Sequence, residues 1–156
     1  MPSEIKPRYV SKEELVDSLR EVVTVFNDLN ETRIGLVLFG SRARETNGVD
    51  SDVDLFHFHC GDSDEYIKPI RMLDLRIDNL LFKFGIVSPF FYRVTVLKKW
   101  LLSSLEDEAY RRELLMGRLG LLDKYSLYIG PDEEENNCLL ERALELSSRE
   151  PYSLRW

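Results

Sequence analysis

Long apolar runs, clustered cysteines and an excess of positive charge are all missing from this sequence of 156 residues. No apolar run approaches the roughly 18 residues that a membrane-spanning helix needs. The first ten residues lack the apolar core of a signal peptide. The two cysteines, Cys60 and Cys138, are too few and too isolated for a disulfide scaffold or a metal framework. We therefore expect a soluble, cytoplasmic protein that does not enter a membrane.

The net charge of −7 argues against nucleic acid as a partner, because backbone binding needs clustered lysine and arginine. The length is close to the commonest domain size, and 44% of the residues are hydrophobic, enough for one good core. We expect one domain over residues 1–156. Its core spans about residues 11–100, and a helical C-terminal extension spans about residues 101–150.

One stretch in the first third of the chain carries the strongest signal. Ile34–Phe39 is an apolar run that ends at a Gly-Ser pair, and a second apolar run includes Asp52 and Asp54. Apolar runs of this length, bounded by turn residues, are typical of buried strands. Because residues two apart on a strand point the same way, Asp52 and Asp54 should share a face. Two neighbouring carboxylates repel each other unless a cation lies between them, which favours a magnesium site.

The Gly-Ser pair between these two runs suggests a phosphate site. Gly40 allows a tight turn and a close approach to a ligand. Ser41 begins a predicted short helix to Glu45, and a helix N-terminus favours anionic oxygens. Arg42 and Arg44 follow, and arginine binds phosphate well. A phosphate site beside paired carboxylates indicates metal-assisted phosphoryl or nucleotidyl transfer.

The two-part motif Gly40–Arg44 and Ser51–Leu55 resembles the signature of the DNA polymerase beta-like nucleotidyltransferase superfamily, above all its minimal nucleotidyltransferases. The resemblance implies an α/β fold with a short mixed sheet backed by helices. It also implies that Gly40 and Ser41 hold the triphosphate of ATP or another nucleoside triphosphate. Asp52 and Asp54 would hold Mg²⁺ and carry catalysis, with Arg42 and Arg44 assisting at the phosphates.

The family's third carboxylate, which activates the attacking hydroxyl, should lie on the strand region Ile86–Leu97. No carboxylate is present there, and Ser88 or Thr95 takes its place in a rough alignment. Asp74 or Asp78 on the preceding helix could reach the site instead. Without a base the chain would lose a contribution typically worth 10²–10⁴-fold in rate.

The resemblance also suggests an acceptor for the nucleotide. Minimal family members are often antitoxins that add AMP to a tyrosine of an all-helical HEPN-type toxin partner. A second copy of the chain is a further candidate partner. The chain also departs from the family by having Glu45 where glycine is usual, and a glutamate could forbid a left-handed backbone there. The competing interpretation is a catalytically weak or inactive module that acts by binding a protein partner.

The remaining elements follow from periodicity and capping signals. Ser11 and Glu14 form a capping-box pattern before an amphipathic helix. His57, His59 and Cys60 have no second ligand pair at metal spacing, which favours packed side chains over a zinc site. We predict helices over residues 12–29, 66–84, 104–120 and 132–148, and a short extended piece over residues 121–129.

Overall fold

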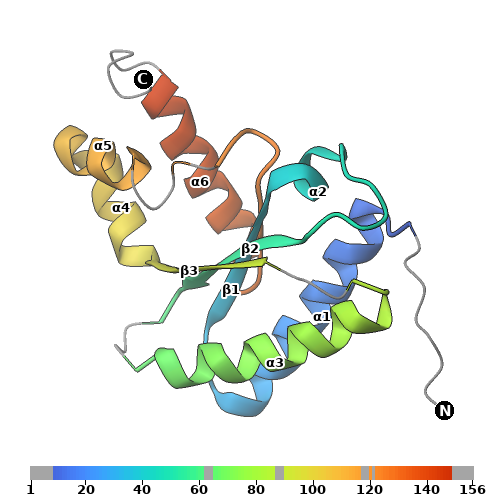
Figure 1. The fold of residues 1–156 in the computed structure, drawn as a ribbon. Coiled ribbons are helices and arrows are strands. Elements are labelled where there is room, and N and C mark those ends of the chain that lie inside the picture. Colours follow the sequence, from blue (N-terminus) through green and yellow to red (C-terminus); the bar gives the residue numbers. More distant parts are fainter. Residues whose placement is uncertain (1–8, 62–64, 87–89, 117–119, 121, 149–156) are drawn as a thin grey trace, which may run out of the picture.

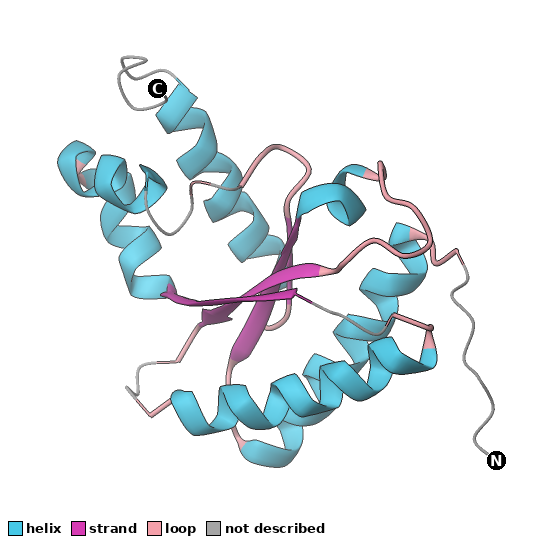
Figure 2. Ribbon diagram, in the orientation of Figure 1, coloured by secondary structure: helices cyan, strands magenta, loops and turns pink. Residues whose placement is uncertain are grey.

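The computed structural model describes residues 9–61, 65–86, 90–116, 120 and 122–148. These residues form a four-stranded mixed sheet with helices packed on both faces (Figure 1 and Figure 2), which confirms the predicted fold class. Within this part of the chain, every helix is too short or too polar to span a bilayer. The elements are α1 (Lys12–Asn30), β1 (Ile34–Phe39), α2 (Gly40–Arg44), β2 (Asp54–His59), α3 (Ile67–Lys83), β3 (Phe90–Leu97), α4 (Lys98–Glu106), α5 (Glu108–Met116), β4 (Leu127–Ile129) and α6 (Glu133–Ser148).

The strands lie in the order β3-β2-β1-β4. β1 pairs antiparallel with both β2 and β4, and β2 pairs parallel with β3. β1 is buried along its whole length, as expected for a continuous apolar run in the middle of a sheet. The extended piece predicted over residues 121–129 is confirmed only at its end, where Leu127–Ile129 forms β4. The sheet thus takes its fourth strand from the last third of the chain.

Alternation along the strands divides the interior into two apolar clusters. Even-numbered apolar residues of β1, such as Leu36, face α1 and α3, whereas Val37 and Phe39 face α4, α5 and α6. β2 follows the same rule, because Leu55 belongs to the first cluster and Phe58 to the second. Any side chain on β2 is therefore assigned to one face by its position alone.

Capping residues start two of the helices, and the sequence predicts only the cap at Ser11 and not the one at Asp107. The Ser11 hydroxyl accepts a hydrogen bond from the Glu14 N–H at 3.1 Å, so α1 begins as predicted. The single helix predicted over residues 104–120 is wrong. Asp107 is extended, and its carboxylate accepts a hydrogen bond from the Tyr110 N–H at 3.1 Å. This cap starts α5 and separates it from α4, which begins earlier, at Lys98.

β4 approaches β1 closely because one position lacks a side chain. A Cβ on Gly35 would lie 2.4 Å from the ring of Tyr128, which is completely buried. The Tyr128 hydroxyl donates to the Pro131 carbonyl at 2.7 Å and lies 3.2 Å from the Cys60 sulfur. Tyr128 therefore links the pairing of β4 with β1 to the segment that leads into α6.

Candidate functional site

The Gly-Ser turn forms where β1 passes directly into α2. Gly40 has a φ of +76°, a left-handed conformation that favours glycine. A Cβ at this position would lie 2.0 Å from Oδ2 of Asp54. Phe39 pairs with Asp54 across the sheet, which explains the contact. The structure therefore places the Asp54 carboxylate directly against the backbone of the turn.

The two predicted metal-binding carboxylates occupy different environments. Asp54 is the first residue of β2 and is partly buried, whereas Asp52 lies just before the strand and is exposed. Val53 and Leu55 are fully buried on the α1 and α3 side. Burial raises the pKa of Asp54, and the negative charge of Asp52 raises it further. The two carboxylates are thus close enough to interact, and a cation between them would relieve both effects.

Arg42, which the sequence predicts to contact phosphate, is buried and bonded within the protein. Its side chain is 2% exposed, and its guanidinium donates to the Ser51 carbonyl from Nε at 3.1 Å and from Nη2 at 2.8 Å. Burial lowers its pKa, while the charge of Asp52 opposes that shift. Arg42 therefore holds the segment that leads into Asp52 against α2.

Arg44 is exposed and lies between two acidic side chains. Its Nη1 pairs with Oδ2 of Asp123 at 3.2 Å, and its charge acts on Asp54 by lowering the pKa of that carboxyl. Glu45, the next residue, takes the left-handed conformation with φ 60° and ψ 35°, and its N–H bonds to the Ser41 carbonyl. The glutamate thus adopts the backbone that glycine would provide, so it does not forbid the turn.

The helix candidates for a third carboxylate lie elsewhere. Asp74 on α3 contacts His57, with 2.6 Å between Oδ1 and Nε2. His57 and Asp54 are three residues apart on β2 and so point to opposite faces of the sheet. Asp78 lies one turn further along α3 and is mostly exposed. Partial desolvation raises its pKa, and the negative charge of Asp74 raises it further. Neither carboxylate is placed beside Asp54.

The candidates on the strand region are Ser88 and Thr95. Ser88 lies outside the described residues, and Thr95 pairs with His57 instead of Asp54. The β3 residue that pairs with Asp54 is Phe90. Among the described residues, no group of three or more histidine, cysteine, aspartate or glutamate side chains could hold a metal ion. The described residues therefore leave Asp52 and Asp54 as a pair of carboxylates without a third such side chain.

A loop within the stretch predicted to be extended lies against α2. This loop, Asp123–Ser126, supplies the partner of Arg44, although 79 residues separate the two positions. Lys12 bridges the same elements, because its Nζ donates to the Ala43 carbonyl at 2.6 Å and to the Tyr125 carbonyl at 3.4 Å. The contacts are long-range, so no local pattern could have indicated them.

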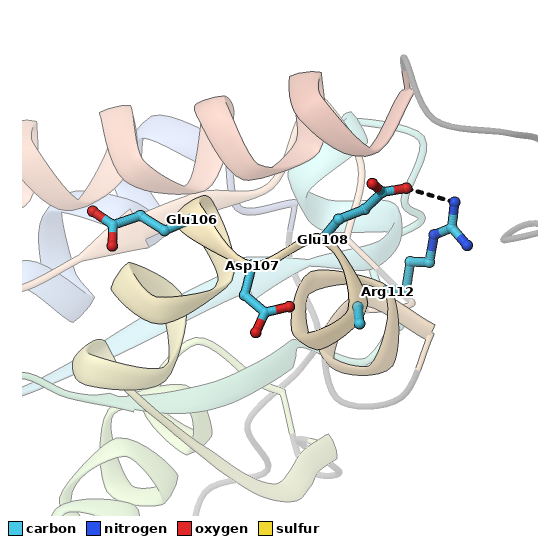
Figure 3. Close-up of a pocket in the computed structure, with 5 residues that line it drawn as sticks. Glu106, Asp107, Glu108 and Arg112 are labelled. Atoms are coloured by element: carbon cyan, nitrogen blue, oxygen red, sulfur yellow. Dashed lines mark hydrogen bonds and ion pairs between the residues drawn. The ribbon is translucent and has the colours of Figure 1, made fainter.

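A surface pocket at the junction of α4 and α5 contains none of the predicted site residues. Figure 3 shows its acidic lining, in which Glu108 pairs with Arg112 at 2.6 Å. The other labelled carboxylates are Glu106 and Asp107. This pocket is formed by α4 and α5, and not by the elements that carry Gly40 and Asp54.

Comparison with known proteins agrees with this geometry. Residues 19–114 match the family model described as a nucleotidyltransferase domain, and the match includes both the Gly-Ser turn and the carboxylate pair. Neither the curated proteins nor the solved structures give a match. Such domains transfer a nucleoside monophosphate from a nucleoside triphosphate, typically with a divalent metal. Since the matched residues make up more than half of the chain, the chain belongs to the nucleotidyltransferase domain family.

Proposed function

We propose that the protein transfers AMP from ATP to an acceptor hydroxyl in a magnesium-dependent reaction. The observation that carries this proposal is the contact between Gly40 and Asp54. A carboxylate that touches a tight glycine turn brings a metal ligand and a phosphate-binding backbone into one site. Asp52, which acts electrostatically on Asp54, completes the pair.

The donor set fits magnesium. Mg²⁺ prefers hard oxygen ligands and is commonly held by one or two carboxylates together with substrate phosphates. Asp52 and Asp54 would hold it, and Gly40 and Ser41 would bind the triphosphate through backbone N–H groups and the serine hydroxyl. When bound, the ion supplies positive charge at the reacting phosphate. Arg44, which is exposed beside Asp54, is the arginine suited to the phosphates.

In the proposed reaction the acceptor oxygen attacks the α-phosphorus of ATP. A bond forms between that oxygen and phosphorus, the bond to the β-phosphate bridging oxygen breaks, and pyrophosphate leaves. The acceptor proton passes to solvent, because the described residues place no third carboxylate beside Asp54. A base supplied by the acceptor protein would remove this limitation. The acceptor we propose is a tyrosine of a small helical HEPN-type partner, supported by the resemblance and by the acidic balance of the chain.

The first test is thermal unfolding with and without ATP and Mg²⁺, for the wild type and for Asp54→Asn. A ligand at 100 times its Kd adds about 2.7 kcal/mol of stability. We expect the wild-type Tm to rise by roughly 5–10 °C, at about 2–4 °C per kcal/mol. Asp54→Asn should lose the rise. Asp50→Asn, which removes an exposed charge in the same connection, is the matched control and should keep it.

A second experiment, a label-transfer assay, separates catalysis from partner binding. Transfer of label from α-labelled ATP to a partner tyrosine, abolished in Asp54→Asn, would support the enzyme. The observation that favours the alternative is Phe90 in the position beside Asp54. If no nucleoside triphosphate changes the Tm, the enzyme proposal is wrong, and a module that binds a protein partner is the better description.

A further inference from the structure

The Asp123–Ser126 loop lies at the edge of the sheet that carries the candidate site. It leads into β4, whose first residue, Leu127, pairs with Leu38 near the end of β1, two residues before Gly40. Figure 1 shows this orange segment running beside α2. Because β1 passes directly into α2, the loop and the Gly-Ser turn are held at the same edge.

The loop has a fixed shape, and one side chain fastens it to α2. Oδ1 of Asp123 accepts from the Tyr125 N–H at 2.9 Å, and the Asp123 carbonyl accepts from the Ser126 N–H at 3.1 Å. The Asp123 N–H donates to the Ser126 hydroxyl at 3.1 Å. Oδ2 of Asp123 is then left for Arg44. A loop with such bonds can present side chains in a defined direction.

Two side chains of this loop have the chemistry that a nucleotide needs. Tyr125 is 46% exposed, and the Lys124 ammonium lies 5.1 Å from the centre of its ring. Tyrosine offers a flat face on which a nucleobase can stack, and lysine offers charge to phosphate. Arg44, three residues beyond Ser41, joins the loop to the site. Three residues of helix span only about 4.5 Å.

We propose that the Asp123–Ser126 loop forms the nucleobase side of the nucleotide site, with Tyr125 as the stacking residue. Asp123 positions the loop by pairing with Arg44, and the Lys124 ammonium adds positive charge over the Tyr125 ring. This inference rests on the proposed function, because it requires a triphosphate at Gly40 and Ser41. It assigns a role to a segment outside the residues that match the family model.

The test compares ATP with a ligand that has the three phosphates but lacks the nucleoside. Binding of ATP and of inorganic tripolyphosphate, each with Mg²⁺, is measured by calorimetry. Base–aromatic stacking of the usual strength predicts that Tyr125→Ala weakens ATP binding by about 5- to 150-fold. Tripolyphosphate binding should be unchanged. Tyr125→Phe keeps the ring and should bind ATP like the wild type. Phe82→Ala, which removes an exposed aromatic from α3, is the matched control and should also be unchanged.

Each contrary result has a distinct meaning. If Tyr125→Ala binds ATP as the wild type does, or weakens tripolyphosphate and ATP equally, the loop does not contact the base and this inference is wrong. The proposed function would survive either result. If the wild-type protein binds neither ligand, the nucleotide site itself is absent, and both proposals are overturned together.

Discussion

Arg42 has the largest side chain among those that the described residues bury completely. A buried guanidinium is costly unless its donors find acceptors. Here the Ser51 carbonyl accepts two of them, and the negative charge of Asp52 favours the charged form. The arginine therefore fastens the segment before β2 to α2. Because Asp52 and Asp54 follow that segment, the position of both carboxylates depends on this contact.

Replacing Arg42 should therefore destabilise the fold more than replacing its exposed neighbour. Arg42→Met removes both donors to the Ser51 carbonyl, and hydrogen bonds to a charged group contribute about 1.5–3 kcal/mol. Arg44→Met, the matched control, should change the free energy of unfolding by less than about 1 kcal/mol, since exposed ion pairs contribute little. Urea unfolding followed by circular dichroism measures both. Equal and small effects would show that the Arg42 contacts do not hold this segment.

At the scale of elements, the packing of β4 on β1 depends on the absence of a side chain at Gly35. A Cβ there would meet the Tyr128 ring at 2.4 Å, and that ring is completely buried. Overpacking of this kind typically costs about 1–3 kcal/mol. Gly35→Ala should lower the free energy of unfolding by at least that much. Gly48→Ala, in an exposed loop with no atom nearer than 3.4 Å, is the control and should be close to neutral.

A double substitution shows whether Tyr128 is the cause. Tyr128→Leu alone removes a buried ring and should be destabilising. Combined with Gly35→Ala it should cost less than the sum of the two single changes, because residues in contact are not additive. An additive result from equilibrium unfolding of all three variants would mean that the two positions do not clash.

The stability of the whole molecule should fall in alkaline solution. Tyr128 is completely buried, and burial raises the pKa of its hydroxyl well above its usual value near 10. An unfolded tyrosine loses its proton above about pH 10, whereas the folded one keeps it. The contribution is therefore fully present below pH 10 and is lost as the pH rises towards the folded pKa. The linkage slope for one such group is at most about 1.4 kcal/mol per pH unit.

Urea unfolding between pH 9 and 11 measures that slope. Tyr128→Phe should flatten it, although the variant also loses the hydrogen bond to the Pro131 carbonyl. Tyr125→Phe removes an exposed hydroxyl and should keep the wild-type slope. Burial also raises the pKa of the Cys60 thiol, so a smaller decline should begin near pH 8.5. A slope that does not change in Tyr128→Phe would contradict this explanation.

The sequence by itself determined the features that depend on neighbouring residues. The Ser11 cap, the span of α1, the apolar run of β1 and the Gly40 turn each arise from interactions within a few positions, and each is visible as a pattern. The two carboxylates were visible in the same way, as acidic residues interrupting an apolar run, although β2 begins only at Asp54 and Asp52 lies just before it. Family membership follows from the same stretch.

Only the tertiary structure decided how distant segments meet. Between the partners of Leu55 and His57, β3 advances four residues while β2 advances two, and this irregularity places Phe90 beside Asp54. No local pattern encodes such a register. The contact between Arg44 and Asp123 is equally invisible, because it joins positions 79 residues apart. Short-range preferences act through adjacent backbone, whereas register and docking depend on how the whole interior packs.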